Sequence, residues 1–407
     1  MAVKETVFLT RVVLSNYKSI KACSVKLGEL NFLVGPNGAG KSNFLDAIRL
    51  VAEALNTSLD HALRDRGGIN EVRRRSSGHP AHFGIRLEFA FPGGMTGFYA
   101  FRVAAQEKGG FEVQQEECRI FGKRGLQEAF FKVVSGNVKQ SHALIMPPAS
   151  GDRLYLVAAA GLPEFRPLYD ALSRMGLYNL NPDVIRELQP PDTGEMLRRD
   201  GGNLASVLNL MTKEDEALRK QVVEFLSKVV PGVQDVTVKH IGKKEALEFR
   251  QKIGNNKEPW RFTAENMSDG TLRALGVLTA LFQTTGGNSR RIPLVGIEEP
   301  EVAVHPGASG VLRDALRVAS ANTQVVVTSH SPDLLDDKSV GDDCILGVSN
   351  VNGETKIGPI DEAGRSAICD RLYTAGELLR MGQLEPDLEV VNKISESQLD
   401  LFGEAHP

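Results

Sequence analysis

The sequence predicts an α/β fold with a mixed parallel sheet, an antiparallel β subdomain and a helical insertion. Three observations support this prediction. Apolar, β-branched runs end in glycine-rich or acidic turns and are followed by helical patterns, as in parallel sheets. Residues 82–118 alternate apolar and polar positions around glycine-rich turns, which indicates an antiparallel sheet with one wet face. Residues 141–232 contain proline-interrupted helical pieces without sustained heptads, so no long coiled coil is expected.

These differences in texture divide the chain into four segments. Residues 1–135 are expected to form the N-terminal part of a head domain, and residues 136–235 a mainly helical insertion. Residues 236–385 would complete the head. Residues 386–407 are polar and acidic, which favours a flexible tail. A chain of 407 residues can hold two domains or one large domain with an insertion.

Composition excludes several classes of protein. Hydrophobic residues make up 42% and charged residues 24%, which is typical of a globular protein with a core. The net charge of -3 gives no global basic field, so any nucleic-acid site has to be local. The four cysteines form no CxxC pair, which argues against a zinc site and indicates a reducing, cytoplasmic location. No apolar run of about 18 residues is present, so no membrane span is expected.

Residues 35–42, with the sequence GPNGAGKS, fit the phosphate-binding pattern G-x-x-x-x-G-K-[ST]. A predicted strand over residues 30–34 precedes this P-loop and a predicted helix over residues 43–55 follows it, a context that disfavours a chance glycine turn. Lys41 would reach the β- and γ-phosphates of ATP, and the Ser42 hydroxyl would ligate Mg²⁺. The expected nucleotide contacts from this region are Asn37, Gly38, Gly40, Lys41, Ser42 and Asn43.

A further candidate contact lies before the P-loop. Residues 8–14 and 24–27 are predicted to be strands, and Lys18 lies between them. A lysine at the end of a strand beside a P-loop could contact the nucleotide phosphates. On residue type alone, a solvated lysine in a turn fits equally well.

Residues 64–75 hold five arginines, the strongest basic cluster of the chain. The cluster could bind a nucleic-acid backbone or hold a lid over the nucleotide. The alternative is a solvated loop in which the arginines pair with Asp65 and Glu71.

A turn with the sequence Ser268-Asp269-Gly270-Thr271 precedes a predicted helix over residues 272–282. The N-terminus of such a helix favours an anion, so Ser268 and Gly270 are candidate phosphate contacts. An ordinary N-cap by Ser268 or Asp269 explains the same residues.

An apolar strand over residues 293–297 ends in two carboxylates, which is the Walker B arrangement. Glu298 would hold Mg²⁺ directly or through water, and Glu299 would orient and deprotonate the attacking water. A second β-branched strand ends at His330, whose neutral imidazole could hydrogen-bond a γ-phosphate oxygen. A strand followed by an acidic turn, and a loop histidine, are the plainer alternatives.

The order of these motifs resembles the ABC-type ATPase heads of the RecF, SMC and OLD group, most closely the stand-alone AAA/OLD-like ATPases. The resemblance implies that Ser268 and Gly270 contact the γ-phosphate held by a partner subunit, so that ATP joins two heads in a homodimer. It also implies that Lys18 contacts phosphate, that Glu299 is the catalytic glutamate and that His330 is the switch histidine. The glutamine typical of such heads has no clear counterpart, because neither Gln114 nor Gln115 has a spacing that singles it out.

The resemblance has limits that shape the expected function. Only about 75 residues follow His330, fewer than a Toprim nuclease domain needs. The acidic residues between 333 and 343 are expected to form a wet surface, so no intrinsic nuclease activity is predicted. The expected function is an ATP-hydrolysing switch in DNA repair or anti-phage defence, with DNA or a separately encoded effector as partner. A non-hydrolysing, nucleotide-gated scaffold is the alternative.

Overall fold

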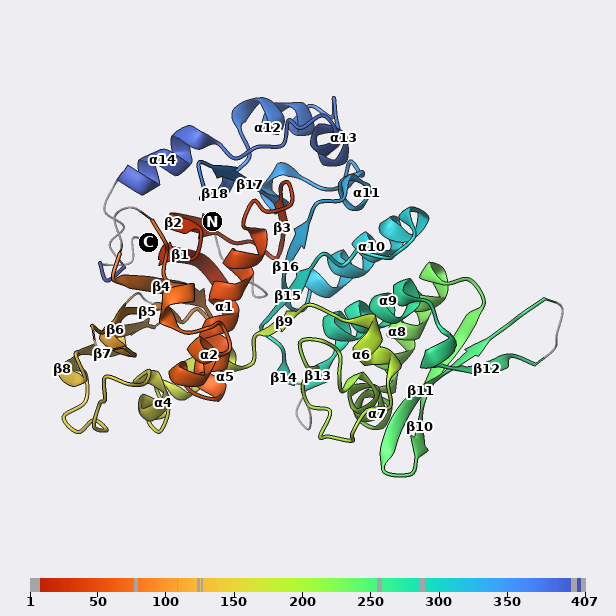
Figure 1. Cartoon of the computed structure of the whole chain (residues 1–407), viewed down its shortest axis with the longest axis horizontal. Helices are drawn as coiled ribbons and strands as arrows, with labels where there is room; N and C mark the ends of the chain where they lie inside the picture. The colour runs from red at the N-terminus through yellow and green to blue at the C-terminus, as the bar shows by residue number, and fades with distance from the viewer. Residues whose placement is uncertain are drawn as a thin grey trace. The chain divides into compact units, whose positions relative to one another are not determined.

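Segments distant in sequence come together in two separate units of the chain, coloured by residue number in Figure 1. The computed structural model describes residues 8–76, 80–107, 109–122, 125, 127–254, 258–285, 290–396 and 401–403. Unit 1 is made of Met1–Met175, Gly341–Leu372 and Met381–Pro407. Unit 2 is made of Gly176–Val340 and Tyr373–Arg380. No helix among the described residues is long and apolar enough to cross a membrane.

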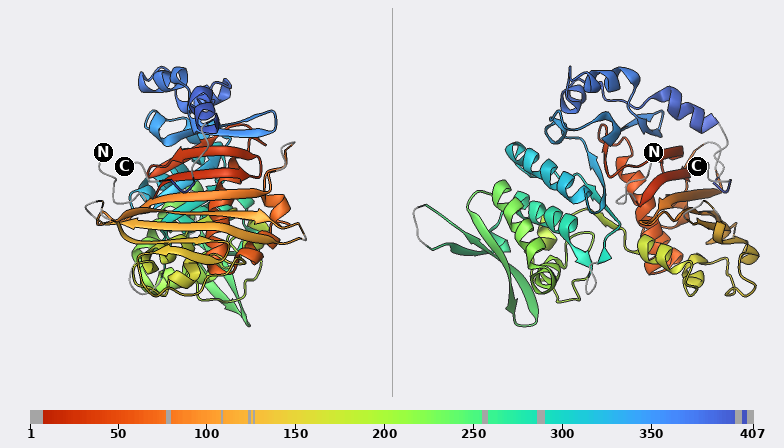
Figure 2. Two further views of the ribbon diagram at one scale, coloured as in Figure 1. Left: turned by 90° about the vertical axis from the view of Figure 1, so that its left-hand side faces the viewer. Right: turned by 180° about the vertical axis from the view of Figure 1, so that it is seen from behind.

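Unit 1 contains a seven-stranded antiparallel sheet in the order β2-β1-β4-β5-β6-β7-β8, whose long strands face the viewer in the left panel of Figure 2. Its strands are β1 (Leu9–Tyr17), β2 (Ile20–Lys26), β4 (His82–Ala90), β5 (Thr96–Ala105), β6 (Phe111–Phe121), β7 (Gln127–Val134) and β8 (Asn137–Ser141). This is the antiparallel β subdomain that the alternating pattern predicts, and it confirms that part of the fold class.

The prediction of one wet face is wrong for the middle of this sheet, because β4 and β5 are buried on both faces. On the second face, the Arg86 guanidinium lies 3.8 Å from the centre of the Phe98 ring. It also donates to the carbonyls of Leu401 (3.1 Å) and Gly403 (2.8 Å). A Cβ atom on Gly84 would lie 2.2 Å from Leu401, so the glycine leaves room for this cover.

Part of the predicted tail, residues 386–407, packs on unit 1, whereas residues 397–400 and 404–407 lie outside the described residues. Helix α14 (Leu388–Glu396) packs on β2 and β18, and the Leu401 side chain is buried. Apolar residues spaced along an otherwise acidic segment supply the buried contacts that its overall composition conceals.

The P-loop strand of unit 1 pairs with a hairpin from the C-terminal part of the chain. Strand β3 (Leu30–Val34) pairs in parallel with β17 (Ile345–Val351), which forms a hairpin with β18 (Glu354–Pro359). The hairpin turns at Asn352 and Gly353, both with positive φ, as an Asn-Gly sequence favours. The helices of unit 1 are α1 (Lys41–Asn56), α2 (Leu59–Arg64), α3 (Ile69–Val72), α4 (Leu156–Ala159), α5 (Arg166–Ser173), α12 (Glu362–Cys369) and α14, with the 3₁₀ turn η3 (Asp342–Cys344).

Unit 2 contains three parallel strands, with β15 (Leu294–Glu298) between β9 (Gly176–Tyr178) and β16 (Gln324–Ser329). Helix α9 packs on β15, and α10 on β16. Burial on both sides explains why these strands read as continuous apolar runs. The helices of unit 2 are α6 (Pro182–Arg186), α7 (Leu204–Glu214), α8 (Glu216–Val229), α9 (Asp269–Phe282), α10 (Ser309–Ser320), α11 (Pro332–Leu335) and α13 (Ala375–Arg380), with the 3₁₀ turns η1 (Ala264–Asn266) and η2 (Pro306–Ala308).

Unit 2 also carries an antiparallel sheet of β10 (Val233–Ile241), β11 (Lys244–Gln251) and β12 (Trp260–Thr263), with α7 and α8 against it. A short pair, β13 (Thr284–Thr285) and β14 (Arg290–Arg291), follows α9. The two units divide the chain differently from the predicted segments. Residues 136–235 begin in a strand of unit 1 and end in helices of unit 2, because β8 extends the antiparallel sheet before the helical region starts.

The β6 residue Glu116 makes the stability of unit 1 depend on pH. Its fully buried carboxylate accepts from the Tyr99 hydroxyl (2.9 Å) and from the backbone N–H groups of Tyr155 and Leu156. Burial nevertheless raises the pKa of Glu116 from 4.5 to about 7. A native pKa above the unfolded value adds stability at low pH, which is lost as pH rises through about 7.

We therefore expect the wild-type protein to lose about 3 kcal/mol of unfolding free energy relative to Glu116→Gln between pH 5 and pH 8. Urea unfolding of both proteins across this range measures the difference. Substitution of the exposed Glu362 by Gln is the matched control. Parallel pH profiles for Glu116→Gln and the wild type would contradict the assignment.

Candidate nucleotide-binding site

The P-loop of unit 1 has the backbone that its glycines predict. Strand β3 ends at Val34, and α1 begins at Lys41 after a loop in which Gly38 (φ 77°) and Gly40 (φ 101°) are left-handed. A Cβ atom on Gly40 would lie 2.0 Å from the Thr355 Oγ1 atom. Glycine is therefore needed at position 40 for both its conformation and its closeness to β18.

The two chemical groups of the P-loop differ in exposure. The buried Lys41 ammonium donates to the carbonyls of Gly35 (2.8 Å) and Pro36 (3.1 Å), which keeps it against the loop. Ser42 is exposed at the first turn of α1, as is Asn37 in the loop. A charged donor beneath the loop and an open hydroxyl at the helix start fit the phosphates of a nucleotide and an oxygen-seeking cation such as Mg²⁺.

A chain of side-chain hydrogen bonds holds the P-loop to the β17–β18 hairpin. The Asn43 amide donates to Ser19 Oγ (2.7 Å), which lies 2.7 Å from Thr355 Oγ1. Thr355 in turn donates to the carbonyl of Ala39 (2.8 Å) and is fully buried. Asn43, expected to contact nucleotide, therefore also anchors the loop through Ser19.

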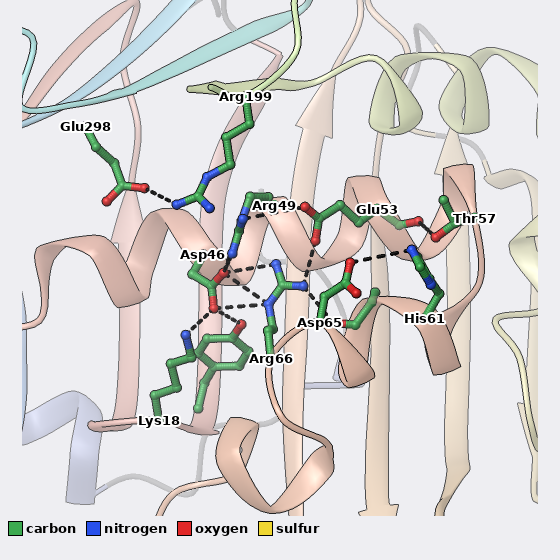
Figure 3. Close-up of polar contacts among 12 residues, drawn as sticks. Lys18, Asp46, Arg49, Glu53, Thr57, His61, Asp65, Arg66, Arg199 and Glu298 are labelled. Carbon is green, nitrogen blue, oxygen red and sulfur yellow. Dashed lines mark hydrogen bonds and ion pairs between the residues drawn. The ribbon is translucent and has the colours of Figure 1, made fainter. Parts of the chain in front are cut away.

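Lys18 lies in the turn between β1 and β2, with its ammonium 2.5 Å from the Asp46 carboxylate on α1 (Figure 3). Asp46 also accepts from Arg49, from Arg66 and from the Tyr17 hydroxyl. Burial opposes ionisation of Asp46, but the three cations outweigh it and hold the pKa of this carboxyl well below its ordinary value. Lys18 would have to exchange Asp46 for a phosphate in order to contact the nucleotide.

The arginines at 64–75 do not form one free cationic face. Arg66 is 3% exposed and pairs with Asp46 and Glu53, as Figure 3 shows. Its neighbours are also engaged: Arg64 with Asp60, Arg73 with Asn70 and the Pro80 carbonyl, Arg74 with Glu354, and Arg75 with Glu71. This pattern favours the alternative in which the cluster is internally paired.

Unit 2 brings the two predicted catalytic residues into contact. Glu299 follows β15 with an unusual left-handed backbone (φ 46°), and its N–H donates to the Thr328 carbonyl (2.9 Å). Its carboxylate lies 3.3 Å from Nδ1 of His330, which follows β16. A strained backbone at a non-glycine residue persists only when the surroundings hold it, so the fold fixes this carboxylate beside the imidazole.

Glu301, to which the sequence analysis assigned no role, anchors the histidine loop. Its buried carboxylate accepts from the Ser329 hydroxyl (2.6 Å) and from the His330 N–H (3.3 Å). The segment after β15 and the loop after β16 are thereby tied together.

Glu298, the predicted metal ligand, is the last residue of β15, and its carboxylate accepts from Arg199 (3.2 Å; Figure 3). Ile297 pairs with Tyr178, the last residue of β9, so the next residues of the two segments, Glu298 and Asn179, follow side by side. The Asn179 N–H donates to the Arg199 carbonyl (3.0 Å). The Arg199 guanidinium and the Asn179 backbone amide therefore accompany the predicted metal ligand. The candidate glutamines Gln114 and Gln115 lie on β6 of unit 1.

Arg273 of α9 connects the helix that follows the predicted phosphate-binding turn to the backbone of Glu298 and Glu299. Its buried guanidinium donates to the carbonyls of Glu298 (3.1 Å), Glu299 (3.1 Å) and Leu180 (2.8 Å). A Cβ atom on Gly270 would lie 2.2 Å from the Ala303 carbonyl, so the turn itself also touches the segment after β15.

Ser268 is the N-cap of α9, as the plainer reading of this turn predicts. Its hydroxyl accepts from the N–H of Thr271 (3.3 Å) while the residue remains exposed. Asp269 is held by Arg186 of α6. A cap and an anion contact are compatible, because an exposed serine at a helix N-terminus can serve both.

The acidic run after His330 is an ion-paired surface. Arg380 binds Asp333 (2.7 Å) and Asp336 (2.9 Å), and Arg313 binds Asp337 (2.7 Å). Within the described ranges, no group of three or more His, Cys, Asp or Glu residues is placed to hold a metal ion. A Mg²⁺ bound through one hydroxyl, one carboxylate and phosphate oxygens does not need such a group.

The chain is similar in sequence to several known proteins. A family described as "AAA domain, putative AbiEii toxin, Type IV TA system" matches residues 30–109 and 214–336. The DNA replication and repair protein RecF of Vibrio parahaemolyticus is 46% identical over 44 residues, 11% of this chain and 12% of RecF. The OLD nuclease of Thermus scotoductus is 22% identical over 337 residues, 80% of this chain and 59% of the nuclease.

Solved structures show the same fold at low identity. An SMC head bound to the C-terminal winged-helix domain of ScpA has a TM-score of 0.52 at 14% identity, covering 88% of this chain and 99% of the head. A Pyrococcus furiosus SMC head with an extended coiled coil, bound to the C-terminal domain of ScpA, has a TM-score of 0.52 at 12% identity, covering 90% and 99%.

Fold, motifs and matches together define the chain as an ABC-type P-loop ATPase head. Within that class it is an OLD-like head of the RecF, SMC and OLD group.

Arg273 provides a test of the geometry in unit 2. Arg273→Met keeps most of the side-chain volume but removes three hydrogen bonds to backbone carbonyls. Two of these carbonyls belong to Glu298 and Glu299. Because a displacement of about 1 Å can cost roughly 100-fold in rate, we expect ATP turnover to fall at least about tenfold while the KM for ATP changes little. Arg313→Met, which breaks a remote ion pair, is the control. Unchanged turnover in a folded Arg273→Met protein would argue against this positioning role.

Proposed function

We propose that the protein hydrolyses ATP and uses the cycle as a switch. Lys41 and the P-loop backbone hold the phosphates, while Ser42 and Glu298 hold Mg²⁺. The observation that carries the proposal is Glu299, kept in a strained conformation with its carboxylate 3.3 Å from His330. A carboxylate held beside an imidazole after two parallel strands is suited to orienting water at a γ-phosphate.

The residues of this chain divide the work. Glu299 accepts a proton from the attacking water, and His330 orients that water and the γ-phosphate by hydrogen bonds. The Lys41 ammonium offsets negative charge on the transferred group. Ser42 and Glu298 would hold Mg²⁺, which would supply positive charge near the phosphates. Glu298 must exchange its Arg199 partner for this cation, which links metal binding to the segment that carries Arg199.

The switch consists of ATP-dependent association of two chains. Ser268 and Gly270 at the start of α9 contact the γ-phosphate held by the partner subunit. ATP can drive association only by binding the dimer more tightly than the monomer, and hydrolysis removes that difference. Arg273 connects α9 to the backbone of Glu298 and Glu299. Contact of the turn with a partner subunit is thereby coupled to the position of the catalytic glutamate.

The proposed client is DNA, with a separately encoded effector carrying out any further chemistry. Support comes from relatives named for DNA replication and repair and for nuclease activity. We propose no nuclease activity for this chain, because Asp333, Asp336 and Asp337 form ion pairs with arginines. Incubation of supercoiled plasmid with the purified protein and Mg²⁺ should leave the plasmid intact.

ATP turnover during a titration of double-stranded DNA, at fixed moderate salt, tests the proposed function. We expect turnover that rises with DNA and disappears in Lys41→Ala. Turnover indifferent to DNA would remove DNA as the client and direct attention to proteins that bind the Glu299→Gln form. Absence of turnover under all conditions would leave only the nucleotide-gated scaffold.

A further inference from the structure

The β10–β12 sheet of unit 2 has one covered and one open face. Val236, Leu247 and Phe249 point to one side, where they are buried and where α7 and α8 pack on the sheet. Because side chains alternate along a strand, the residues between them point to the other side. The short turn η1 also contacts β11 and β12.

We define the outer face of this sheet by its five cations, Lys239, Lys244, Arg250, Lys252 and Arg261. The register places Arg250 directly opposite Arg261. Like charges directly opposite each other destabilise a sheet, although Arg250 also lies opposite Asp235 of β10. An anion bound across the two arginines would offset that cost.

The carboxylates near the outer face do not neutralise it. Glu248 is shared between Lys239 (3.9 Å) and Arg261 (3.6 Å), and both cations remain mostly exposed, at 59% and 66% of their side-chain surface. Asp235 is already bound by Arg219 of α8 (2.7 Å). The Nε atom of Arg250 is buried without a hydrogen-bond partner in the described part of the chain.

The charge of this module differs from that of the whole protein. Residues 233–263 contain seven Lys and Arg against four Asp and Glu, whereas the whole chain has 48 against 51. The arginines at 64–75 carry a similar surplus in the sequence, but they are paired with carboxylates, including Asp46, Glu354 and Glu71. A local cationic surface on an acidic protein is the footprint expected of an anionic polymer.

We infer that the outer face of the β10–β12 sheet binds the phosphate backbone of double-stranded DNA. From Lys244 at the start of β11 to Lys252, just after its end, the cations extend over about 27 Å, at roughly 3.4 Å per residue. This length corresponds to about eight base-pair steps of a duplex. Trp260 shares the face of Gln251 and not that of the cations, so the outer face lacks a platform for stacking single-stranded bases.

This inference deepens the proposed function by naming the surface that meets DNA, and DNA binding can be measured without hydrolysis. Fluorescence anisotropy of a labelled 30-base-pair duplex compares the wild type with the triple variant Lys239→Gln, Lys244→Gln, Arg261→Gln. We expect binding at least about tenfold weaker, with the slope of log K against log salt reduced by about three.

The control removes three exposed lysines from the helices of the same unit, by Lys213→Gln, Lys220→Gln and Lys228→Gln. It makes the same change in net charge and should leave affinity and salt slope near the wild-type values. Equal binding by the outer-face variant and the wild type would overturn the inference, as would equal losses in both variants. Preferential binding of poly-glutamate over DNA at this face would assign it to an acidic protein.

Basal ATP turnover distinguishes a failure of the DNA-binding inference from a failure of the proposed ATPase function. The outer-face residues take no part in the proposed catalysis, so turnover without DNA should be unchanged in the triple variant. A protein that binds DNA through this face but does not hydrolyse ATP would contradict only the proposed function.

Discussion

Glu299→Gln should lower ATP turnover by about 100-fold or more while leaving ATP binding intact, because removing a general base typically costs 10²–10⁴ in rate. Glutamine keeps the length of the side chain and can still form a hydrogen bond with His330, but it cannot accept a proton from water. The backbone at 299 is held by the hydrogen bond from its N–H to Thr328, which the substitution does not alter. The loss should therefore appear in kcat rather than in the Kd for ATP.

Single-turnover hydrolysis and equilibrium binding of a fluorescent ATP analogue measure these quantities separately. Glu224→Gln, at an exposed position on α8, makes the same chemical change away from the carboxylates of the site. Hydrolysis by Glu299→Gln at the wild-type rate would show that another group activates the water.

Lys41→Ala should weaken ATP binding by about 100-fold or more, since deleting one partner of a buried, hydrogen-bonded charge pair costs roughly 2–5 kcal/mol. The Lys41 ammonium donates to the Gly35 and Pro36 carbonyls. ATP offers it phosphate oxygens with full negative charge, which are stronger acceptors. The substitution removes this donor and leaves the glycine backbone of the loop unchanged.

Isothermal titration with ATP and Mg²⁺ gives the affinity, and thermal unfolding without nucleotide shows whether the loop remains folded. Lys21→Ala, which removes an exposed lysine of β2, should bind ATP like the wild type. Wild-type affinity in Lys41→Ala would mean that the P-loop is not the phosphate site.

The sequence predicts those parts of the site that depend on local pattern. The P-loop, the strand that ends at Glu298 and the cap of α9 all occur where the motifs place them, because strand, turn and helix signals lie within a few residues. The sequence analysis places Glu299 and His330 after two strands, and the structure shows that these strands are parallel neighbours, which brings the two side chains into contact.

Long-range partners could not be predicted. Lys18 is equally compatible with a phosphate and with a turn, and only the fold shows it against Asp46. Arg66 belongs to a conspicuous basic cluster, yet its side chain is buried between carboxylates of α1. The second face of the antiparallel sheet reads as wet because the segment that covers it, around Leu401, lies more than 300 residues away.

The residues that the sequence analysis missed act through the backbone. Arg273 and Glu301 bind carbonyl and N–H groups, which carry no residue-type signal. Arg199 lies about 100 residues before its partner Glu298, within a segment assigned to a helical insertion. A buried arginine three residues after a helix-opening Ser-Asp-Gly turn is the one local feature that could have drawn attention to Arg273.

The central claim, that ATP joins two chains through the turn at Ser268, is tested most directly by sedimentation velocity of Glu299→Gln with and without ATP and Mg²⁺. Two added substitutions provide the contrast. Ser268→Asp keeps the helix cap but places negative charge toward phosphate, whereas Ser268→Asn keeps the cap and can donate to phosphate. We predict that ATP doubles the mass of Glu299→Gln, that Asn at 268 preserves this association and that Asp abolishes it. ATP binding with no change in mass would contradict the account.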